Sequence, residues 1–509
     1  MLVKTYGSAV YGIRAITVTV EVYMDLGVQF FMVGLPDNAV KESHQRIESA
    51  LRYIGRRIPG RKIVINMAPA DIRKEGSAYD LAIAVGILAA NEQIKTEKLE
   101  HYMIMGELSL DGGLMPVKGA LPIALEARAK GFKGLLLPRQ NEGEASIVSG
   151  LDVYGITSLT EVIGFFNDEI KLTPVQMASY QEMAGKVAQY EHDFSDVKGQ
   201  ENIKRALEIG AAGGHNIILI GPPGAGKTML AKRIPSILPP LNEQEALETT
   251  KIHSVAGKLG HHRSLVTLRP FRSPHHTISD VALVGGGSIP QPGEISLAHN
   301  GVLFLDELPE FKRTVLEVLR QPMEERFVMI SRARLSVEYP ASFILIAAMN
   351  PCPCGYYNHP KIDCTCGPGV VQKYLSKISG PLFDRIDIHV EVVPVPFREL
   401  SEGRMPEGSE AIRKRVVESR KIQEKRFQSL PGIHCNAQMP SKVLRKVCIL
   451  DEAGNTILKN AMEKMGLSAR AFDRILKVSR TIADLDGSES IRNEHLAEAI
   501  NYRSLDRDN

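Results

Sequence analysis

Apolar residues in the first 170 positions fall into short runs with two kinds of spacing. Runs rich in β-branched residues predict strands, and runs with helical spacing predict helices between them. The expected strands are 15–22, 29–33, 62–67, 102–107 and 134–138, and the expected helices are 38–54, 77–90 and 121–130. Residues 1–170 are therefore expected to form an α/β domain of their own.

The pattern changes after residues 171–193, a polar stretch with weak periodicity that is the expected linker. A helix at 200–212, a buried strand at 216–220 and a glycine-rich turn come next, and further strands at 302–305 and 343–348 alternate with helices. This order predicts a mostly parallel sheet over residues 194–400. Residues 401–509 carry helical periodicity with almost no strand signal, which predicts a helical lid.

Length and composition support a multidomain globular protein. A chain of 509 residues exceeds what one hydrophobic core normally organises. Its 62 basic and 59 acidic residues nearly cancel, so any contact with nucleic acid must depend on local patches. The longest apolar runs are too short to cross a bilayer, and the first residues do not resemble a secretory signal, so we expect a cytoplasmic protein.

The strongest chemical signal is a glycine-rich loop between the strand at 216–220 and a helix. Its sequence matches the pattern G-x-x-x-x-G-K-[ST] that wraps nucleotide phosphates. Its residues are Gly221, Pro222, Pro223, Gly224, Ala225, Gly226, Lys227 and Thr228. Backbone N–H groups would surround the phosphates, the lysine would reach the outer ones, and the threonine hydroxyl would bind Mg²⁺. ATP is the expected nucleotide, because no guanine-specifying motif is visible.

Two acids end the apolar strand at 302–305. In a parallel sheet this position lies beside the phosphate loop. Asp306 is expected to hold the Mg²⁺ shell, and Glu307 to act as the general base toward the attacking water. Without the phosphate loop, the same pair would be interpreted as a solvated strand end.

Three further polar residues fit an ATPase site. Asn350 follows the strand at 343–348 and is suited to positioning the water or sensing the γ-phosphate. Arg385 follows a turn among apolar residues, as an arginine finger for a neighbouring subunit would; the alternative is an ion pair with Asp384 or Asp387. Arg470 lies in the first turn of a helix, where a cation is unfavourable unless an anion compensates, and is therefore preferred over Arg474 as the lid's sensor arginine, with solvation as the alternative.

Four cysteines lie close together in the sequence, at Cys352, Cys354, Cys364 and Cys366. They are enough for a closed tetrahedral zinc site, but one residue between paired cysteines is fewer than structural zinc loops generally have. Structural Zn²⁺ and reduced thiols in a Pro/Gly-rich loop therefore remain two open interpretations. The adjacent histidines His275 and His276 lack a partner at metal spacing and are interpreted as loop contacts.

A hairpin is expected before the Asn350 strand, with strands 326–330 and 334–338 and a turn at 331–333. It would place Arg332 and Arg334 near its tip, where they are suited to phosphate contacts on DNA. A hairpin with solvated arginines is the alternative.

In this order, these motifs resemble the AAA+ branch of the magnesium chelatase ATPase subunit and the minichromosome maintenance helicases. The closer resemblance is to the YifB/ComM family, through RPFRSPHHTIS at 269–279, GGG at 285–287, PGEISLAHNG at 292–301 and NPCPCG at 350–355. The resemblance implies a hexameric ring that binds ATP and Mg²⁺, and DNA as the substrate of branch migration in recombination and natural transformation. A chelatase ATPase subunit and a protein-remodelling ATPase are the alternatives.

The first 170 residues resemble the proteolytic domain of the Lon family, through KEGSAYD at 74–80 and MGELSLDGG at 105–113. Aligned on these motifs, the catalytic serine of Lon falls on Ala78 and its lysine on Leu121, while Ser77 and Lys118 lie nearby. The resemblance therefore implies a Lon-like domain without the Ser/Lys dyad and without protease activity. The complete expectation is an α/β protein with this domain, an AAA+ P-loop core and an α-helical lid.

Overall fold

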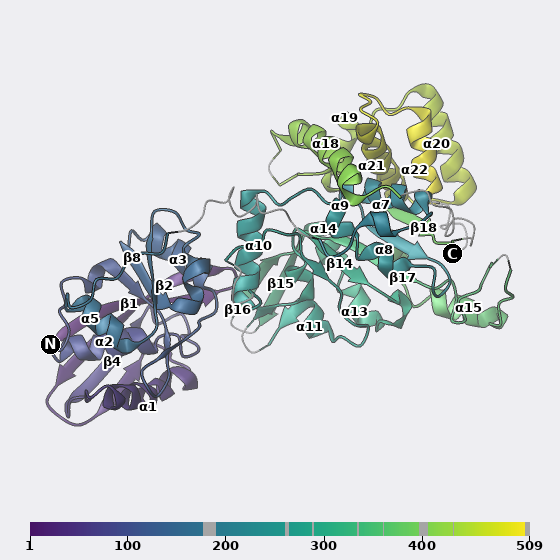
Figure 1. Ribbon diagram of the computed structural model, residues 1–509. Helices are drawn as coiled ribbons and strands as arrows, with labels where there is room; N and C mark the ends of the chain where they lie inside the picture. Colours follow the sequence, from purple (N-terminus) through teal and green to yellow (C-terminus); the bar gives the residue numbers. More distant parts are fainter. Residues whose placement is uncertain are drawn as a thin grey trace. The chain divides into compact units, whose positions relative to one another are not determined.

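The computed structural model describes residues 1–176, 190–259, 264–287, 290–332, 335–359, 361–395, 406–430 and 432–503. The chain separates into two compact units. One contains Met1–Lys186 and Glu243–Val266, and the other contains Val187–Asn242 and Thr267–Asn509 (Figure 1). Most of the expected linker, from 177 to 189, lies outside the described residues.

The first unit is built on a seven-stranded mixed sheet of order β3-β4-β2-β1-β5-β8-β9. Its strands are β1 (Leu2–Tyr11), β2 (Arg14–Asp25), β3 (Phe30–Val33), β4 (Lys62–Ala68), β5 (Tyr102–Ile104), β8 (Gly134–Pro138) and β9 (Asp152–Ile156). β1, β2 and β4 pair antiparallel, whereas β5, β8 and β9 run parallel. A short hairpin of β6 (Glu107–Leu108) and β7 (Leu114–Met115) adds a separate ribbon.

Helices cover this sheet and supply its core. They are α1 (Asn38–Tyr53), α2 (Asp80–Ala90), α3 (Ala120–Ala129), α4 (Glu142–Ala145) and α5 (Leu159–Phe166). α2 packs on β1 and β2, and all eleven of its residues are buried, which explains an apolar run without helical periodicity. The expected strands and helices of this segment are present, except that the strand expected at 102–107 ends at Ile104 and Glu107 belongs to the separate ribbon. β1, β7, β9, α4 and α5 were not expected.

A helix distant in sequence completes the first unit. α10 (Glu243–Val255) packs against α3, and its Leu247 contacts the apolar cluster beneath that helix. The carboxylate of buried Glu144 accepts hydrogen bonds from the hydroxyl of Ser254 and from the backbone N–H of Leu121. This segment was expected within the domain at 194–400. Periodicity shows that a helix has an apolar face but does not show which surface covers that face.

The second unit contains a five-stranded parallel sheet of order β11-β14-β17-β10-β18. Its strands are β11 (Phe271–Arg272), β14 (Val302–Leu305), β17 (Ile344–Met349), β10 (Ile217–Ile220) and β18 (Ile388–Glu391). The three central strands are almost wholly buried, as near-continuous apolar runs in a covered parallel sheet require. Because the strands are parallel, the loops that follow β10, β14 and β17 emerge at one edge.

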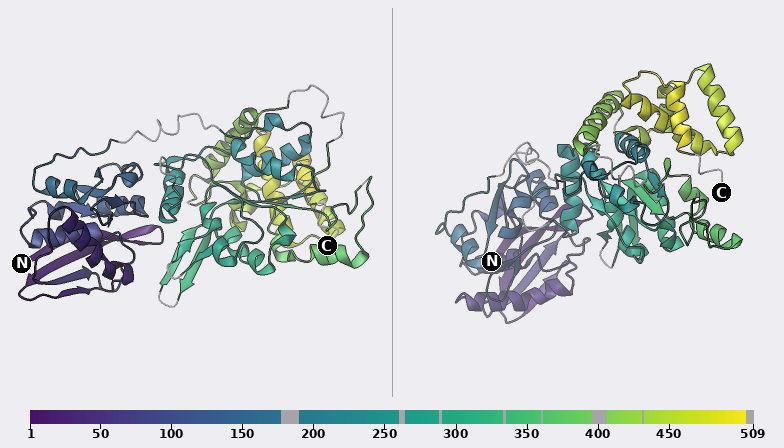
Figure 2. Two further views of the ribbon diagram at one scale, coloured as in Figure 1. Left: turned by 60° about the horizontal axis from the view of Figure 1, so that its bottom comes forward. Right: turned by 45° about the vertical axis from the view of Figure 1, so that its right-hand side comes forward.

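Short helices and two hairpins surround this sheet. The helices are α7 (Glu201–Gly213), α8 (Lys227–Ala231), α9 (Ile234–Ile237), α11 (Asp280–Val284), α12 (Glu294–Leu297), α13 (Arg313–Glu317), α14 (Arg320–Glu325), α15 (Pro368–Leu375) and α16 (Gly380–Phe383). β12 (Gly285–Gly286) pairs with β13 (Gln291–Pro292), and β15 (Phe327–Arg332) pairs with β16 (Leu335–Pro340). The β15–β16 hairpin projects from the body of this unit as a two-stranded ribbon (Figure 2, left).

The last part of the second unit is helical in its described residues, as expected. It contains α18 (Ser409–Phe427), α19 (Ser441–Val447), α20 (Glu452–Met465), α21 (Ala469–Leu485) and α22 (Asn493–Asn501), coloured green to yellow in Figure 1. α21 is strongly amphipathic and packs against α7, α18 and α22. None of the described helices combines the length and the apolar character needed to cross a bilayer.

Candidate nucleotide-binding site

The phosphate loop joins β10 to α8, as the motif requires. Gly224 and Gly226 have positive φ values of 76° and 88°, a region that side chains other than glycine rarely adopt. At Gly221, an added Cβ would lie 2.1 Å from the carbonyl oxygen of Val392, which follows β18. The glycines therefore permit both the turn and the close approach of a neighbouring strand end.

Lys227 and Asn350 come together at this loop. The Lys227 ammonium donates hydrogen bonds to the carbonyls of Gly221 and Pro222 at 2.7 and 2.9 Å, and to Oδ1 of Asn350 at 3.0 Å. Burial lowers the pKa of Lys227, although Asp306 and Glu307 oppose this effect. The order β14-β17-β10 explains the juxtaposition, since Asn350 follows the strand next to β10.

The two acids lie at the adjacent strand end. The hydroxyl of Thr228 donates to Oδ2 of Asp306 at 2.6 Å, so two oxygen ligands of the kind that Mg²⁺ prefers are side by side. Glu307 has a left-handed backbone with φ 53°, and its backbone N–H donates to Oδ1 of Asp306. A non-glycine residue in this region is strained, and such strain often occurs at functional sites. The arrangement suits binding of a magnesium nucleotide and activation of water.

His276 contacts the proposed base and was not assigned to the site from sequence. Its Nδ1 lies 3.3 Å from Oε2 of Glu307, and its ring packs on His275 with centroids 4.1 Å apart. β11 runs parallel beside β14, which brings the loop after Arg272 to the same edge as Glu307. If residues 271–272 had been recognised as a strand, His276 would have been expected at this edge of the sheet. Two residues are too few to show the alternating pattern of a strand.

We expect His276→Ala to lower kcat by about ten- to a hundredfold, because Glu307 loses a neighbour that restricts its orientation. ATP affinity should change little, since the phosphate contacts remain. His275→Ala is the matched control, because His275 is exposed and bonds to Thr277 rather than to an acid. Steady-state kinetics with a fluorescent-nucleotide binding assay separates the two effects; equal losses in both variants would contradict this role.

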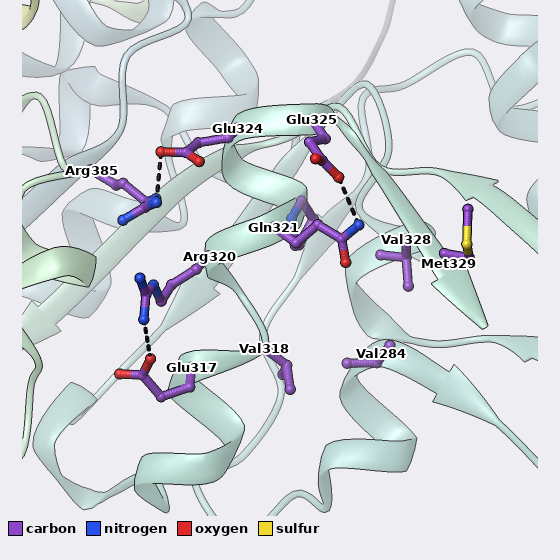
Figure 3. Close-up of a pocket in the computed structure, with 11 residues that line it drawn as sticks. Val284, Glu317, Val318, Arg320, Gln321, Glu324, Glu325, Val328, Met329 and Arg385 are labelled. Atoms are coloured by element: carbon purple, nitrogen blue, oxygen red, sulfur yellow. Dashed lines mark hydrogen bonds and ion pairs between the residues drawn. The ribbon is translucent and has the colours of Figure 1, made fainter. Parts of the chain in front are cut away.

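Arg385 lines a separate cleft of about 520 Å³ (Figure 3). Its guanidinium pairs with Glu324 of α14 at 2.7 Å and donates to the carbonyl of Pro381, and its side chain is almost fully buried. The cleft also holds the ion pair Arg320–Glu317 and a hydrogen bond from Gln321 to Glu325. The intrachain ion pair considered for Arg385 exists, but its partner is Glu324 rather than Asp384 or Asp387.

The two lid arginines have different surroundings. Arg474 pairs with Asp387 at 2.5 Å, whereas Arg470 is exposed and has no side-chain partner among the residues that the structure describes. Asp387 also lies 3.6 Å from Nδ1 of His215 and accepts the backbone N–H of Asn216 at 2.9 Å. Arg474 is therefore engaged in a buried contact, and Arg470 stays our prediction for the sensor arginine.

The four cysteines of the 351–367 segment gather as a metal site requires. All four Sγ atoms lie within 4.8 Å of one another. Three pairs are 3.2, 3.6 and 3.7 Å apart, close to the roughly 3.8 Å that tetrahedral zinc with bonds of about 2.3 Å gives. The backbone N–H of Tyr356 lowers the pKa of the Cys354 thiol to about 5, whereas burial and the neighbouring sulfur atoms raise the pKa of Cys364 and Cys366.

The remaining predicted residues are the two hairpin arginines and the positions aligned with the Ser/Lys dyad of Lon. The hairpin expected to carry the DNA contacts is present, but its strands extend to Arg332 and resume at Leu335. Ser331 and Arg332, which were expected in the turn, are therefore strand residues. Arg334 and the side chain of Arg332 lie outside the described residues. In the Lon-like segment, Ala78 precedes α2, Leu121 is buried in α3, and Ser77 donates its hydroxyl hydrogen to Glu107.

Comparisons with known proteins cover nearly all of the chain. Models of the magnesium chelatase subunit ChlI match residues 19–141 and 193–400, and the model of its C-terminal part matches 406–503. The competence protein ComM of Haemophilus influenzae is 44% identical over 514 residues, covering 99% of this chain and 98% of that protein. YifB of Escherichia coli is 45% identical over 503 residues, covering 98% and 96%.

A more distant match is Lon protease 2 of Bacillus subtilis, 29% identical over 187 residues, which are 31% of this chain and 33% of that protein. The parallel sheet, the phosphate loop with its two acids and the full-length similarity all indicate the same family of ATPases. The chain belongs to the YifB/ComM family of magnesium chelatase-like AAA+ ATPases.

Proposed function

We propose that this ATPase forms a homo-oligomeric ring, a hexamer by family resemblance, that moves DNA in the cytoplasm. Its task would be branch migration in recombination and natural transformation. The observation that carries the proposal is the separation of Arg385 from the nucleotide site. Within the described residues, Lys227 is the lysine or arginine that contacts this site, whereas Arg385 lies with Glu324 in another cleft. A neighbouring copy would therefore supply the arginine.

The roles of the chain's own residues follow from their positions. Lys227 and the loop's backbone N–H groups bind the phosphates of ATP, and Thr228 and Asp306 hold Mg²⁺. Glu307 accepts a proton as water attacks the γ-phosphorus, while Asn350 positions that water. Arg385 of an adjacent subunit, with Arg470 from the lid, stabilises the charge that develops on the transferred phosphoryl group.

Mixing two inactive variants tests whether Arg385 acts between subunits. Arg385→Ala and Lys227→Ala should each hydrolyse ATP about a thousandfold or more slowly than the parent. In mixed rings, a subunit with Lys227 can meet a neighbour with Arg385, so about a quarter of the sites should recover. ATP binding by Arg385→Ala shows that this variant is folded. A mixture that stays inactive although rings form would contradict action between subunits.

DNA as the substrate rests on the resemblance and on local chemistry. The competence protein ComM of Haemophilus influenzae is 44% identical to this chain and covers 99% of it. The first strand of the projecting hairpin ends at Arg332, and Arg334 follows two positions later in the sequence; arginines suit contacts to phosphates. A nearly neutral chain needs such a local basic feature for binding DNA.

ATPase rates with single-stranded, duplex and four-way-junction DNA test this substrate. We expect stimulation that weakens as salt increases, with the junction most effective. Replacing Arg332 and Arg334 by alanine should weaken DNA binding and reduce its salt slope by about one per lost phosphate contact. Replacing Arg413, on the lid helix α18, is the control for loss of a basic charge elsewhere. Rates independent of every DNA would contradict the proposal.

A chelatase ATPase subunit is the second candidate, because the matching family models are those of that enzyme's ChlI subunit. Protein remodelling is the third. The similarity to ComM and YifB over nearly the whole chain favours the motor over the chelatase. Against remodelling stands the lack of an aromatic peptide-gripping motif in the sequence inserts. ATP and Mg²⁺ are the cofactors in all three, and we infer structural Zn²⁺ at the four cysteines.

A further inference from the structure

The cysteine segment is in contact with the phosphate loop. Gly355 lies between the paired cysteines, with φ 88°, and an added Cβ there would lie 2.4 Å from Cδ of Pro223. Pro223 is the third residue of the phosphate loop. The backbone of the cysteine segment thus packs directly on the loop that binds the ATP phosphates.

The same segment is continuous in the chain with Asn350, which immediately precedes it. The side chain of Asn350 accepts a hydrogen bond from the Lys227 ammonium at 3.0 Å. Movement of the segment would therefore displace both Pro223 and Asn350, which contact the nucleotide-binding lysine or its loop.

Little regular structure holds the segment in place. Its described residues, 351–359 and 361–367, form turns and no helix or strand. Local bonds include Gly355 N–H to the carbonyl of Cys352, and Tyr357 N–H to Sγ of Cys352. The sulfur atoms are too far apart for disulfides, and all four thiols are free. A metal that joins them would fix a segment whose own hydrogen bonds are few.

We propose that Zn²⁺ bound by Cys352, Cys354, Cys364 and Cys366 fixes the segment against Pro223 and thereby raises the affinity of the phosphate loop for ATP. The metal and nucleotide sites are thermodynamically coupled through the Gly355–Pro223 contact. Reciprocity then requires ATP to tighten zinc binding by the same factor. The inference rests on ATP binding by this loop and not on DNA as the substrate.

The first test removes the metal from the full-length chain. Zinc is measured by elemental analysis, and ATP affinity by a fluorescent nucleotide without DNA. We expect one zinc per chain in the parent, and loss of zinc with at least about fivefold weaker ATP binding in Cys354→Ser/Cys364→Ser. Cys448→Ala is the control, because this thiol is buried in the lid core away from the cluster. DNA stimulation is measured separately, so failure of the motor proposal leaves this result unaffected.

The second test breaks the contact and keeps the ligands. Gly355→Ala should retain zinc and weaken ATP binding by a similar factor, because its methyl group would collide with Pro223. Gly367→Ala is the control within the segment, since open space surrounds that position, and Gly432→Ala controls for a positive φ elsewhere. A circular-dichroism spectrum like the parent's confirms that each variant is folded.

Two results would overturn the proposal. One is a parent chain that neither contains zinc nor takes it up from solution. The other is a zinc-free cysteine variant, or a folded Gly355→Ala variant, that binds ATP as tightly as the parent. Two results together would support it. Zinc content and ATP affinity should both fall in Cys354→Ser/Cys364→Ser, and ATP affinity should fall in Gly355→Ala while zinc is retained.

Discussion

The Glu307→Gln variant should bind ATP and hydrolyse it about a hundred- to ten-thousandfold more slowly than the parent. The amide keeps the size of the side chain and the left-handed backbone at this position, but it cannot accept the proton of the attacking water. ATP affinity should be equal or slightly higher, because one negative charge beside the phosphates is lost. Single-turnover hydrolysis and equilibrium nucleotide binding measure these two effects.

Glu310→Gln is the matched control for this variant. Glu310 lies three residues further on, is half exposed and contacts Lys377 at 3.5 Å, so it has the same chemistry without access to the phosphates. Lys227→Ala is the opposite case, in which binding itself should be lost. Hydrolysis at the parent rate by Glu307→Gln would show that another group is the base.

Asp387→Ala should lower the free energy of unfolding of the second unit by about 3–5 kcal/mol, because it leaves the Arg474 charge without its buried partner. Burial alone would raise the pKa of Asp387, but Arg474, His215 and the backbone N–H of Asn216 together hold it far below its ordinary value. This carboxylate therefore stabilises the folded state above its unfolded pKa, and the stabilisation is lost as pH falls toward the folded pKa.

Loss of the Asp387–Arg474 ion pair should also affect the ATPase site. Asp387 follows Arg385 by two residues, Arg474 lies one turn from Arg470 on α21, and His215 precedes the strand that leads to the phosphate loop. Thermal unfolding followed with and without ATP identifies the transition of this unit, since ATP raises only the stability of the part that binds it. Asp384→Ala is the control, because Asp384 is half-buried and has no side-chain partner in the described part of the chain.

The sequence predicts those features that depend only on residues close together in the chain. The phosphate loop follows an apolar strand and opens a helix, so residues 221–228 contain both the motif and its structural context. The acid pair at 306–307 was likewise predicted to follow a buried strand, and β14 ends at Leu305 directly before it; the catalytic roles of the two acids stay predictions. The spacing of the four cysteines predicted a cluster without settling zinc, because ligation depends on a loop conformation that spacing does not fix.

Residues that act through contacts distant in sequence could not be found in this way. His276 reaches Glu307 because a two-residue strand pairs with β14, and Glu324 meets Arg385 because two separate segments enclose one cleft. The Asp387–Arg474 pair joins positions 87 residues apart. Neither periodicity nor motif spacing contains information about such pairings, since each depends on the order of strands and the packing of helices.

Neighbouring residues in the chain are enough to specify the phosphate loop, the two acids after a buried strand and the helical last segment. Which parts of the chain come into contact depends on the folded arrangement: Asn350 meets Lys227, Gly355 meets Pro223, and α10 joins the Lon-like unit instead of the ATPase sheet. The physical reason is that local pattern specifies an element and its apolar face, whereas packing against distant elements selects what that face contacts.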